Sequence, residues 1–369
     1  MHPARTLSYS ELITGLEAAV EEKLVNKKIS SDGLWLFNYS NSCVYERAWN
    51  IFTLIARGLI VDPVAQKVIA TPFPKFFNFG ERDEALPDEP FESFEKLDGS
   101  MIDLFHHHGW RAATRGSFDS EQAVWAQNWL TQYDLNHLVQ GTTYLFEATY
   151  PENRIVVRYG ESALTLLGAY LENGTEADYE DLLLLGKATG LPVVERHSFS
   201  SIEDLVEHSH TLSNNQEGFV VRYASGTRIK IKGAEYRRIH ALVSRITPLG
   251  VFECMAAGDN LEAMRREIPE EFWADFDKIS ELLDMRIREI LFHVQGEAAR
   301  FAGQSDKEVG LALSTISPLA RPFIFAYRRG DDLQEGRSRQ ALYKHIRPTG
   351  NRLSGYTPSY TLHRVQDDE

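Results

Sequence analysis

One short stretch constrains the fold most strongly, the hexapeptide Glu95-Lys96-Leu97-Asp98-Gly99-Ser100. It follows an acidic, proline-containing run from Glu81 to Glu92, which is typical of a loop, and it precedes the alternating apolar run Met101–Phe105, which predicts a strand. A lysine at a loop-to-strand junction can be presented to a cleft as a nucleophile, and the glycine lets the backbone approach a phosphate closely. The alternative is a charged surface turn, because Asp-Gly is common in turns.

Strand and helix patterns surround the hexapeptide as far as about residue 246. Apolar or alternating runs predict strands at 34–39, 57–62, 68–71, 110–114, 144–148, 153–157, 163–170, 217–222 and 228–232. Helical spacing predicts a first helix from the capping box at Ser8 to near Lys28, and later helices at 120–133, 176–188 and 201–208. These strands predict antiparallel sheets with flanking helices.

The pattern changes at Thr247-Pro248, after which no strand pattern returns and the apolar residues recur at helical spacing. We therefore predict an α+β fold with two domains. The first, residues 1–246, contains the sheets and the hexapeptide, and the second, residues 247–369, is all-helical.

Composition restricts where such a chain works. The sequence has no apolar run of membrane-spanning length and no signal-peptide pattern, and its two cysteines, Cys43 and Cys254, form neither metal-ligand spacing nor a disulfide framework. We therefore expect a cytoplasmic protein without a membrane partner. The net charge is −14, yet the segment Arg222–Arg245 holds seven Arg or Lys residues and a single acid, which is a basic island suited to a polyanion.

Three further features suggest chemistry at phosphates. Lys75 lies between aromatic residues in a proline-bounded segment, where it could meet a phosphate or base; the alternative is a buried aromatic cluster. Arg228, Lys230 and Lys232 alternate and so share one strand face, which favours an anionic ligand; the alternative is an edge strand protected by its charges. Glu147 stands inside an apolar strand, where a carboxylate needs a cation or a partner.

Several enzyme classes are disfavoured by missing motifs. The sequence contains no G-x-x-x-x-G-K-[ST] loop, no G-x-G-x-x-G after a strand, no G-x-S-x-G elbow and no H-E-x-x-H. A P-loop ATPase, a protein kinase and a Rossmann enzyme are therefore not expected.

The remaining motifs, in this order, resemble those of the covalent nucleotidyltransferase superfamily of DNA ligases, RNA ligases and capping enzymes. Residues 96–99 match its K-x-D-G nucleophile motif, and later motifs match at Phe146-Glu147, Glu217-Gly218 and 230–232. The terminal serine of K-x-D-G-S, the upstream run 75–78, Arg57-Gly58, Gly116-Ser117 and the run 153–156 make the sequence more similar still to the T-even phage RNA ligase 1 family. The resemblance covers roughly residues 30 to 240.

The resemblance implies an N-terminal adenylyltransferase domain and an ATP-dependent reaction with Mg²⁺, or alternatively Mn²⁺. Lys96 would attack ATP to form lysyl-AMP, AMP would pass to an RNA 5′-phosphate, and a 3′-hydroxyl would then displace AMP. A free lysine has a pKa of about 10.4, and we expect neighbouring cations, namely a metal, Lys230 and Lys232, to favour the neutral amine.

The resemblance also implies roles for individual residues. Asp98 and Ser100 would orient the hexapeptide, and Lys230 and Lys232 would act with Lys96 in catalysis. Residues expected to contact the nucleotide or the phosphates are Arg57, Lys75, Phe77, Glu95, Lys96, Gly99, Arg115, Glu147, Glu217, Lys230, Lys232 and Tyr236. Arg115 stands where the family pattern has lysine, which changes the donor geometry.

The expected metal ligands are Glu147, Glu217 and Asp259; the alternative for Asp259 is ordinary helix N-capping. The partners would be ATP and single-stranded or broken-loop RNA ends, for example those of tRNA, and we expect a monomer. The alternatives are a DNA ligase or capping enzyme, disfavoured because no OB-fold pattern follows Lys232, and a non-catalytic protein that binds RNA ends.

Overall fold

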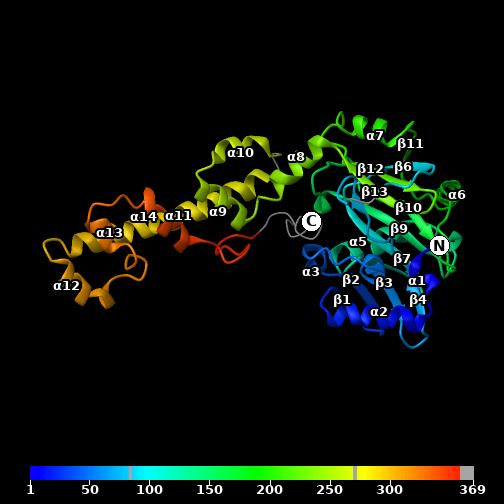
Figure 1. Ribbon diagram of the computed structural model, residues 1–369, viewed down its shortest axis with the longest axis horizontal. Helices are drawn as coiled ribbons and strands as arrows, with labels where there is room; N and C mark the ends of the chain where they lie inside the picture. The colour runs from blue at the N-terminus through cyan, green and yellow to red at the C-terminus, as the bar shows by residue number, and fades with distance from the viewer. Residues whose placement is uncertain (83–84, 269–271, 358–369) are drawn as a thin grey trace. The chain divides into compact units, whose positions relative to one another are not determined.

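The computed structural model describes residues 1–82, 85–268 and 272–357 (Figure 1). The chain divides into two compact units, Met1–Arg238 and a second that begins at Ile239, and the division falls within helix α8 (Ala234–Val243). The domain boundary expected at 246/247 lies a few residues later and stays a prediction. The observed mixture of antiparallel sheets and helices confirms the α+β class.

The first sheet is antiparallel, in the order β1-β2-β3-β4. Its strands are β1 (Val25–Ile29), β2 (Trp35–Tyr39), β3 (Arg57–Asp62) and β4 (Lys67–Ala70), and its helices are α1 (Pro3–Thr6), α2 (Tyr9–Glu21), α3 (Asn41–Tyr45) and α4 (Ile51–Ile55). Helix α2 buries Leu12 and Leu16 against the sheet residue Phe37. The prediction that this helix reaches Lys28 is wrong, because Lys23 adopts φ 62°, which breaks the helix, and β1 follows.

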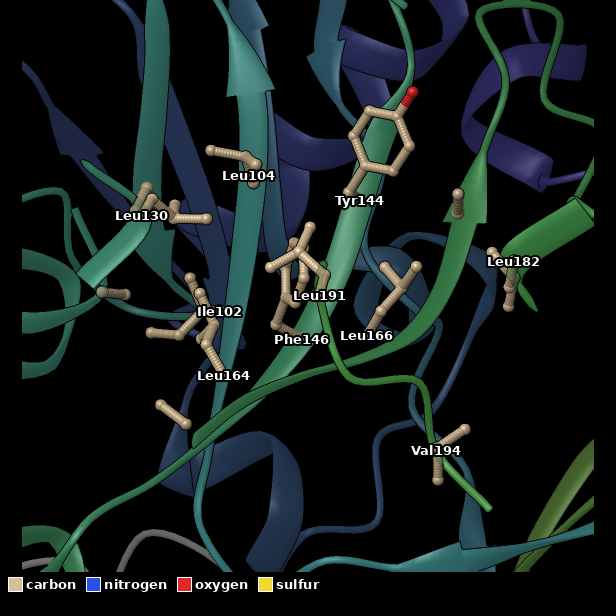
Figure 2. Packing of buried hydrophobic residues seen from close by; sticks show 14 of the residues in the cluster. Ile102, Leu104, Leu130, Tyr144, Phe146, Leu164, Leu166, Leu182, Leu191 and Val194 are labelled. Atoms are coloured by element: carbon tan, nitrogen blue, oxygen red, sulfur yellow. The ribbon is translucent and has the colours of Figure 1, made fainter. Parts of the chain in front are cut away.

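The second sheet is antiparallel, in the order β10-β9-β7-β8. Its strands are β7 (Ser100–His106), β8 (Trp110–Thr114), β9 (Thr143–Thr149) and β10 (Ala163–Tyr170). Helices α5 (Glu121–Trp129) and α6 (Tyr179–Thr189) and short 3-10 turns at Leu130–Gln132, Leu135–His137 and Pro151–Asn153 belong to the same part of the chain. Figure 2 shows the core that covers one face, where Ile102, Phe146 and Leu164 project together. Because alternate residues face opposite ways, Met101 and Glu147 lie on the other face.

The third sheet has the order β11-β6-β12-β13-β5. Its strands are β5 (Phe77–Asn78), β6 (Phe91–Lys96), β11 (Arg196–His197), β12 (Gly218–Tyr223) and β13 (Arg228–Lys232), with helix α7 (Ile202–Ser209) packed on its apolar residues. Strand β12 is antiparallel to β6 and β13, whereas β5 runs parallel to β13. Strand β13 is therefore not an edge strand where β5 pairs with it, and the edge-strand interpretation of its charges is wrong there.

The hexapeptide carries the chain from the third sheet into the second. Lys96 is the last residue of β6 and Ser100 is the first of β7. The predicted strand after Gly99 is confirmed, whereas the loop predicted before Lys96 ends at β6, which is paired with β12 through Lys96 and Gly218. The nucleophile candidate therefore lies on a paired strand, which holds its backbone more firmly than a loop would.

The described residues of the second unit are helical, as predicted. Its helices are α9 (Pro248–Ala257), α10 (Leu261–Glu267), α11 (Trp273–Arg300), α12 (Asp306–Leu311), α13 (Ile324–Arg328) and α14 (Gly336–Ile346), with a 3-10 turn at Leu313–Thr315. Helix α11 buries an apolar stripe at helical spacing that includes Phe276, Leu283 and Val294, and it packs against α9, α13 and α14. In the part of the chain that the structure describes, no helix is long and apolar enough to span a membrane.

Candidate active site

A buried carboxylate joins two lysines at one end of the third sheet. The Nζ atom of Lys96 lies 2.7 Å from Oε2 of Glu217, and the Nζ atom of Lys232 lies 3.1 Å from Oε1. Glu217 is only 3% exposed. The strand register explains the arrangement, because Gly218 pairs with Lys96 on one side and with Lys232 on the other, so both lysines flank the residue before it.

Gly218 is required by this geometry. Its φ is +144°, and a Cβ atom at this position would lie 2.1 Å from the carbonyl oxygen of Ile231. No side chain fits there without displacing β13. The Glu217-Gly218 pair, which the sequence suggested as a motif, thus combines a charge with the close strand approach that brings two cations to it.

The charges around Lys96 stabilise its ammonium form. Burial lowers the pKa of Lys96, but Glu217, Glu147 and Asp98 outweigh burial, so the net pKa is raised. Burial likewise raises the pKa of Glu217, and the charges of Lys96 and Lys232 reverse that effect, so its pKa is lowered. The prediction that neighbouring cations keep Lys96 neutral is wrong for the protein residues alone, because its direct neighbour is a carboxylate.

Glu147 brings a second carboxylate to this site. It lies on β9 opposite Met101, and its Oε1 atom accepts a hydrogen bond of 3.0 Å from the backbone N–H of Gly99. Burial raises the pKa of Glu147 to about 8, with Glu217 adding to the effect and Lys96 opposing it. Glu147 and Glu217 interact electrostatically, and the raised pKa of Glu147 disfavours its ionised form. Together they form a set of hard oxygen donors that fits a divalent cation.

Asp259, the third expected metal ligand, belongs to the second unit. It follows Gly258, the left-handed C-cap of α9, and its backbone N–H donates to the carbonyl of Cys254. The helix α10 is capped by the next residue, Asn260, whose side chain accepts from the N–H of Ala263. No group of three or more His, Cys, Asp or Glu side chains suited to a metal occurs within residues 1–82, 85–268 and 272–357.

Asp98 is buried and fully hydrogen-bonded. Its Oδ2 atom accepts from the backbone N–H groups of Val156 and Val157, each at 2.8 Å, and its Oδ1 atom accepts from the hydroxyl of Tyr236 at 2.8 Å. Burial and the charge of Glu217 raise the pKa of Asp98 to about 6, against the effect of these hydrogen bonds. Its contacts are those of a residue that anchors the hexapeptide.

The prediction of a strand at 153–157 is wrong, because this segment bonds to Asp98 and does not pair with a strand. The backbone N–H groups of Val156 and Val157 donate to the carboxylate of Asp98 and not to a neighbouring strand. Asn153 makes a further contact, between its Oδ1 atom and the hydroxyl of Ser100 at 3.0 Å. Side-chain acceptors thus replace sheet pairing in this segment.

A second cationic group has an aromatic frame. The Nζ atom of Lys75 lies 5.7 Å, 5.6 Å and 5.4 Å from the ring centroids of Tyr39, Trp49 and Phe77. Nearby, the guanidinium of Arg57 lies 5.2 Å from the Phe76 ring, and that of Arg115 donates to the Tyr39 hydroxyl at 2.6 Å. Sequence reasoning missed Tyr39 and Trp49, because they lie outside the quoted motifs and only the fold brings them to Lys75.

The alternating cations of β13 separate into different pairs. Arg228 contacts Glu176, which also accepts from Arg222, whereas Lys232 contacts Glu217. Lys230 lies between them and pairs with Asn78 on β5. Carboxylates of the protein thus lie against Arg228 and Lys232, and an anionic ligand on this face stays a prediction.

Three remaining candidates occupy different surroundings. Glu95 precedes Lys96 on β6, so its side chain takes the opposite face, where burial and the charge of Glu195 raise its pKa. Gly99 lies so close to β9 that a Cβ atom would meet the carbonyl oxygen of Ala148 at 2.3 Å. Tyr236 is buried, and its ring centroid lies 5.2 Å from the Nζ atom of Lys232. The structure therefore brings Gly99 and Tyr236 to the Lys96 site and places the side chain of Glu95 apart from it.

Comparison with known proteins finds similarity over the segment that contains these residues. An RNA ligase family model of the T4 RNA ligase 1 type matches residues 55–236, the segment that runs from β3 to Tyr236. The RNA ligase of Rhodothermus phage RM378 is 25% identical over 294 residues, which cover 58% of this chain and 66% of the phage protein. A protein of Autographa californica nuclear polyhedrosis virus, named for bifunctional polynucleotide kinase/RNA ligase activity, is 29% identical over 257 residues, which cover 60% of this chain and 36% of the viral protein.

These relatives extend beyond the matched region. The chain spans between 36% and 66% of the length of the curated relatives described above. Among solved structures, an archaeal ATP-dependent RNA ligase shares 15% identity with a TM-score of 0.47, over 96% of this chain and 94% of that chain. Over residues 55–236, which contain the K-x-D-G-S motif and the Glu217 carboxylate shared by two lysines, the chain is similar to the T4 RNA ligase 1-like family of RNA ligases.

Proposed function

We propose that this protein is an ATP-dependent RNA ligase that joins RNA ends bearing a 5′-phosphate and a 3′-hydroxyl. The observation that supports this most directly is the contact of 2.7 Å between Lys96 and Glu217, with Lys232 on the other oxygen of the same carboxylate. It combines a candidate nucleophile, a proton acceptor and a second cation in one place, within the segment that matches the family.

The first step would form lysyl-AMP. The Nζ atom of Lys96, after losing a proton, attacks the α-phosphorus of ATP; an N–P bond forms, the bond to the bridging oxygen breaks, and pyrophosphate leaves. Glu217 accepts the hydrogen bond of Lys96 and is the group in position to receive its proton. Lys230 and Lys232 would offset the negative charge that builds up on the α-phosphate.

Glu147 and Glu217 would hold the divalent cation. When bound, it would supply positive charge at the phosphates and weaken the hold of Glu217 on the ammonium, which favours the reactive amine. Because Asp259 lies in the second unit, it is proposed only as an additional carboxylate for metal or substrate contacts.

The later steps would transfer AMP and then release it. An oxygen of the RNA 5′-phosphate attacks the phosphorus of lysyl-AMP, the N–P bond breaks, and Lys96 recovers a proton. The 3′-hydroxyl of the other strand then loses its proton and attacks the activated 5′-phosphate, and AMP leaves as the phosphodiester forms.

The aromatic-framed cations would bind phosphates. We assign Arg57, Lys75 and Arg115 to the triphosphate and the RNA end, and Phe77 to packing beside the nucleotide. Gly99 and the backbone of Glu95 would approach the nucleotide, and Tyr236 would act through Asp98. The adenylyltransferase domain would comprise residues 1–246 and the helical domain residues 247–369. The substrate would be RNA with a broken loop, such as tRNA. The protein would act as a monomer in the cytoplasm.

The decisive experiment uses ATP labelled on the α-phosphate. Wild-type protein, Lys96→Ala and the control Lys187→Ala, which changes an exposed lysine on α6, are incubated with Mg²⁺ and run on a denaturing gel. We expect label on the wild type and the control and none on Lys96→Ala. Protein purified with AMP already attached is first stripped with pyrophosphate, so that bound AMP cannot hide the reaction.

Joining assays separate the remaining alternatives. RNA ends should be sealed, and DNA ends of the same sequence should be sealed at least about tenfold more slowly. Faster sealing of DNA would favour a DNA ligase, and transfer of GMP to a 5′-diphosphate end would favour a capping enzyme. A wild-type protein that takes no label but binds RNA ends would instead be an end-binding protein.

A further inference from the structure

The segment Asn153–Tyr159 contacts two residues of the hexapeptide, Asp98 and Ser100, through four hydrogen bonds. We infer that Tyr159 is a positioning residue for the nucleophile Lys96, and that it acts in lysyl-AMP formation and not in the final joining of RNA ends. This inference rests on the proposed function and adds to it a residue that none of the sequence motifs assigned.

Tyr159 supports a backbone position in the three-residue gap between β6 and β7, which strand pairing leaves open. Strand β6 ends at Lys96 and β7 begins at Ser100, so the N–H of Asp98 lies between two sheets. That N–H donates to the hydroxyl oxygen of Tyr159 at 2.7 Å. A partly buried N–H without an acceptor is costly, so this bond defines where the backbone lies.

The same segment holds the side chain of Asp98. The backbone N–H groups of Val156 and Val157 donate to its Oδ2 atom, while Tyr159 accepts from its backbone. The short run from Val156 to Tyr159 thus binds both the main chain and the side chain of Asp98. This double attachment fixes the orientation of the peptide that leads directly from Lys96.

The anchored peptide connects to both carboxylates of the site. Lys96, two residues before Asp98, bonds to Glu217, and Gly99, the residue after it, donates to Glu147 at 3.0 Å. A shift of the Asp98 backbone would therefore move the amine of Lys96 relative to Glu217. Catalysis by a positioned nucleophile is sensitive to displacements of this kind.

The hydroxyl of Tyr159 is suited to a neutral, permanent role. Burial raises the pKa of Tyr159 far above its usual range, and the surrounding charges of Asp98, Glu217 and Glu147 add to the effect. The phenol therefore does not ionise under working conditions. It serves as a hydrogen-bond partner and not as an acid or base.

The test is Tyr159→Phe, which removes the acceptor oxygen and keeps the ring. The control is Tyr144→Phe, because the hydroxyl of Tyr144 also accepts a backbone bond, from the N–H of Val139 at 2.8 Å, without contacting residues 95–100 (Figure 2 shows this hydroxyl at the edge of the core). Each variant removes the hydroxyl that accepts a bond from one backbone N–H in the same unit. Rates are normalised to the folded fraction measured by circular dichroism, so that unfolded protein does not count as lost activity.

Two reactions are compared. For Tyr159→Phe we expect lysyl-AMP formation to fall by about 10- to 100-fold in maximal rate, with the KM for ATP changed by less than about twofold. Joining of RNA that already carries AMP on its 5′-phosphate should change by less than about threefold, because its AMP no longer comes from Lys96. Tyr144→Phe should match the wild type in both reactions.

The outcomes separate this inference from the proposed function. If wild-type protein takes no label, the proposed function fails, and the inference fails with it. If wild type is labelled but Tyr159→Phe forms lysyl-AMP at the wild-type rate, only the inference is overturned. An equal loss in both reactions, or a loss equal to that of Tyr144→Phe, would also overturn it, since either result indicates general structural support.

Discussion

The Nζ atom of Lys96 and the Oε2 atom of Glu217 lie 2.7 Å apart, although the two residues are separated by 121 positions in the chain. Glu217 is buried and shares its other oxygen with Lys232. The candidate nucleophile is therefore held as an ion pair and must leave this pair before it can attack a phosphorus atom. The contact positions the amine and at the same time lowers its reactivity.

Replacing Glu217 by Ala should destabilise the protein, because two partly buried ammonium groups would lose their shared counter-charge. The side chains of Lys96 and Lys232 are 20% and 18% exposed, so solvent screens part of the effect. We expect a loss of about 1 to 3 kcal/mol in the free energy of unfolding, measured by urea denaturation. Glu203→Ala, at an exposed position of α7, is the control; an equal loss in both variants would contradict the prediction.

Removing only the charge of Glu217 should make Lys96 reactive at lower pH. Glu217 is the largest of the charges that raise the pKa of Lys96, so Glu217→Gln lowers that pKa and the neutral amine appears earlier as pH rises. The measurement is the rate of modification of Lys96 by an amine-reactive reagent across a pH series, read by mass spectrometry without ATP. Lys187 on α6 serves as an internal reference in the same samples. A Lys96 profile that stays in place, or moves to higher pH, would refute the ion-pair argument.

Asp103 should make the protein less stable as pH rises. The residue is fully buried on β7, and neither carboxylate oxygen has a hydrogen-bond partner among the residues that the structure describes. Burial raises the pKa of Asp103 to about 8, against the opposing charge of Arg57. An unfolded aspartate has a pKa of about 3.9, so between about pH 4 and pH 8 the folded form keeps a proton that the unfolded form has released.

Asp103→Asn removes this linkage, because asparagine does not ionise. Relative to the wild type, the variant should gain stability with rising pH by at most roughly 1.4 kcal/mol per pH unit across that window, and the difference should level off above it. Thermal or urea unfolding at several pH values measures the difference. Asp178→Asn changes an exposed carboxylate in the same unit and is the control. A constant difference between Asp103→Asn and the wild type from pH 4 to pH 8 would show that Asp103 is ionised in the fold.

Gly218 should be among the positions of the third sheet that least tolerate substitution by a residue with a side chain. A Cβ atom there meets a strand carbonyl at 2.1 Å, whereas Gly226, which also has positive φ, has nothing within 4 Å of the same atom. We expect Gly218→Ala to cost about 3 kcal/mol or more in unfolding free energy, and Gly226→Ala only about 1 kcal/mol for its backbone conformation. Denaturant unfolding of both variants measures the gap. Equal costs would mean that backbone conformation, and not strand contact, explains the glycine.

Local pattern and fold contribute differently to this protein. The sequence by itself determined which residues share a strand face, so it placed Lys230 with Lys232, put Glu147 in the sheet and predicted the strand after Gly99. It also indicated a helical second part. These properties depend on periodicity and turn chemistry over a few residues, and they can be deduced without knowing what each face meets.

Only the tertiary structure decided which ion-pair and hydrogen-bond partners the charged residues have. It paired Lys96 with Glu217, directed Arg228 to Glu176, and turned the expected strand at 153–157 into a set of donors for Asp98. It also reversed the expected direction of the pKa of Lys96. The reason is physical: the electrostatic energy of a charge depends on distances of a few ångströms, and these are set by the register of strands that are far apart in sequence.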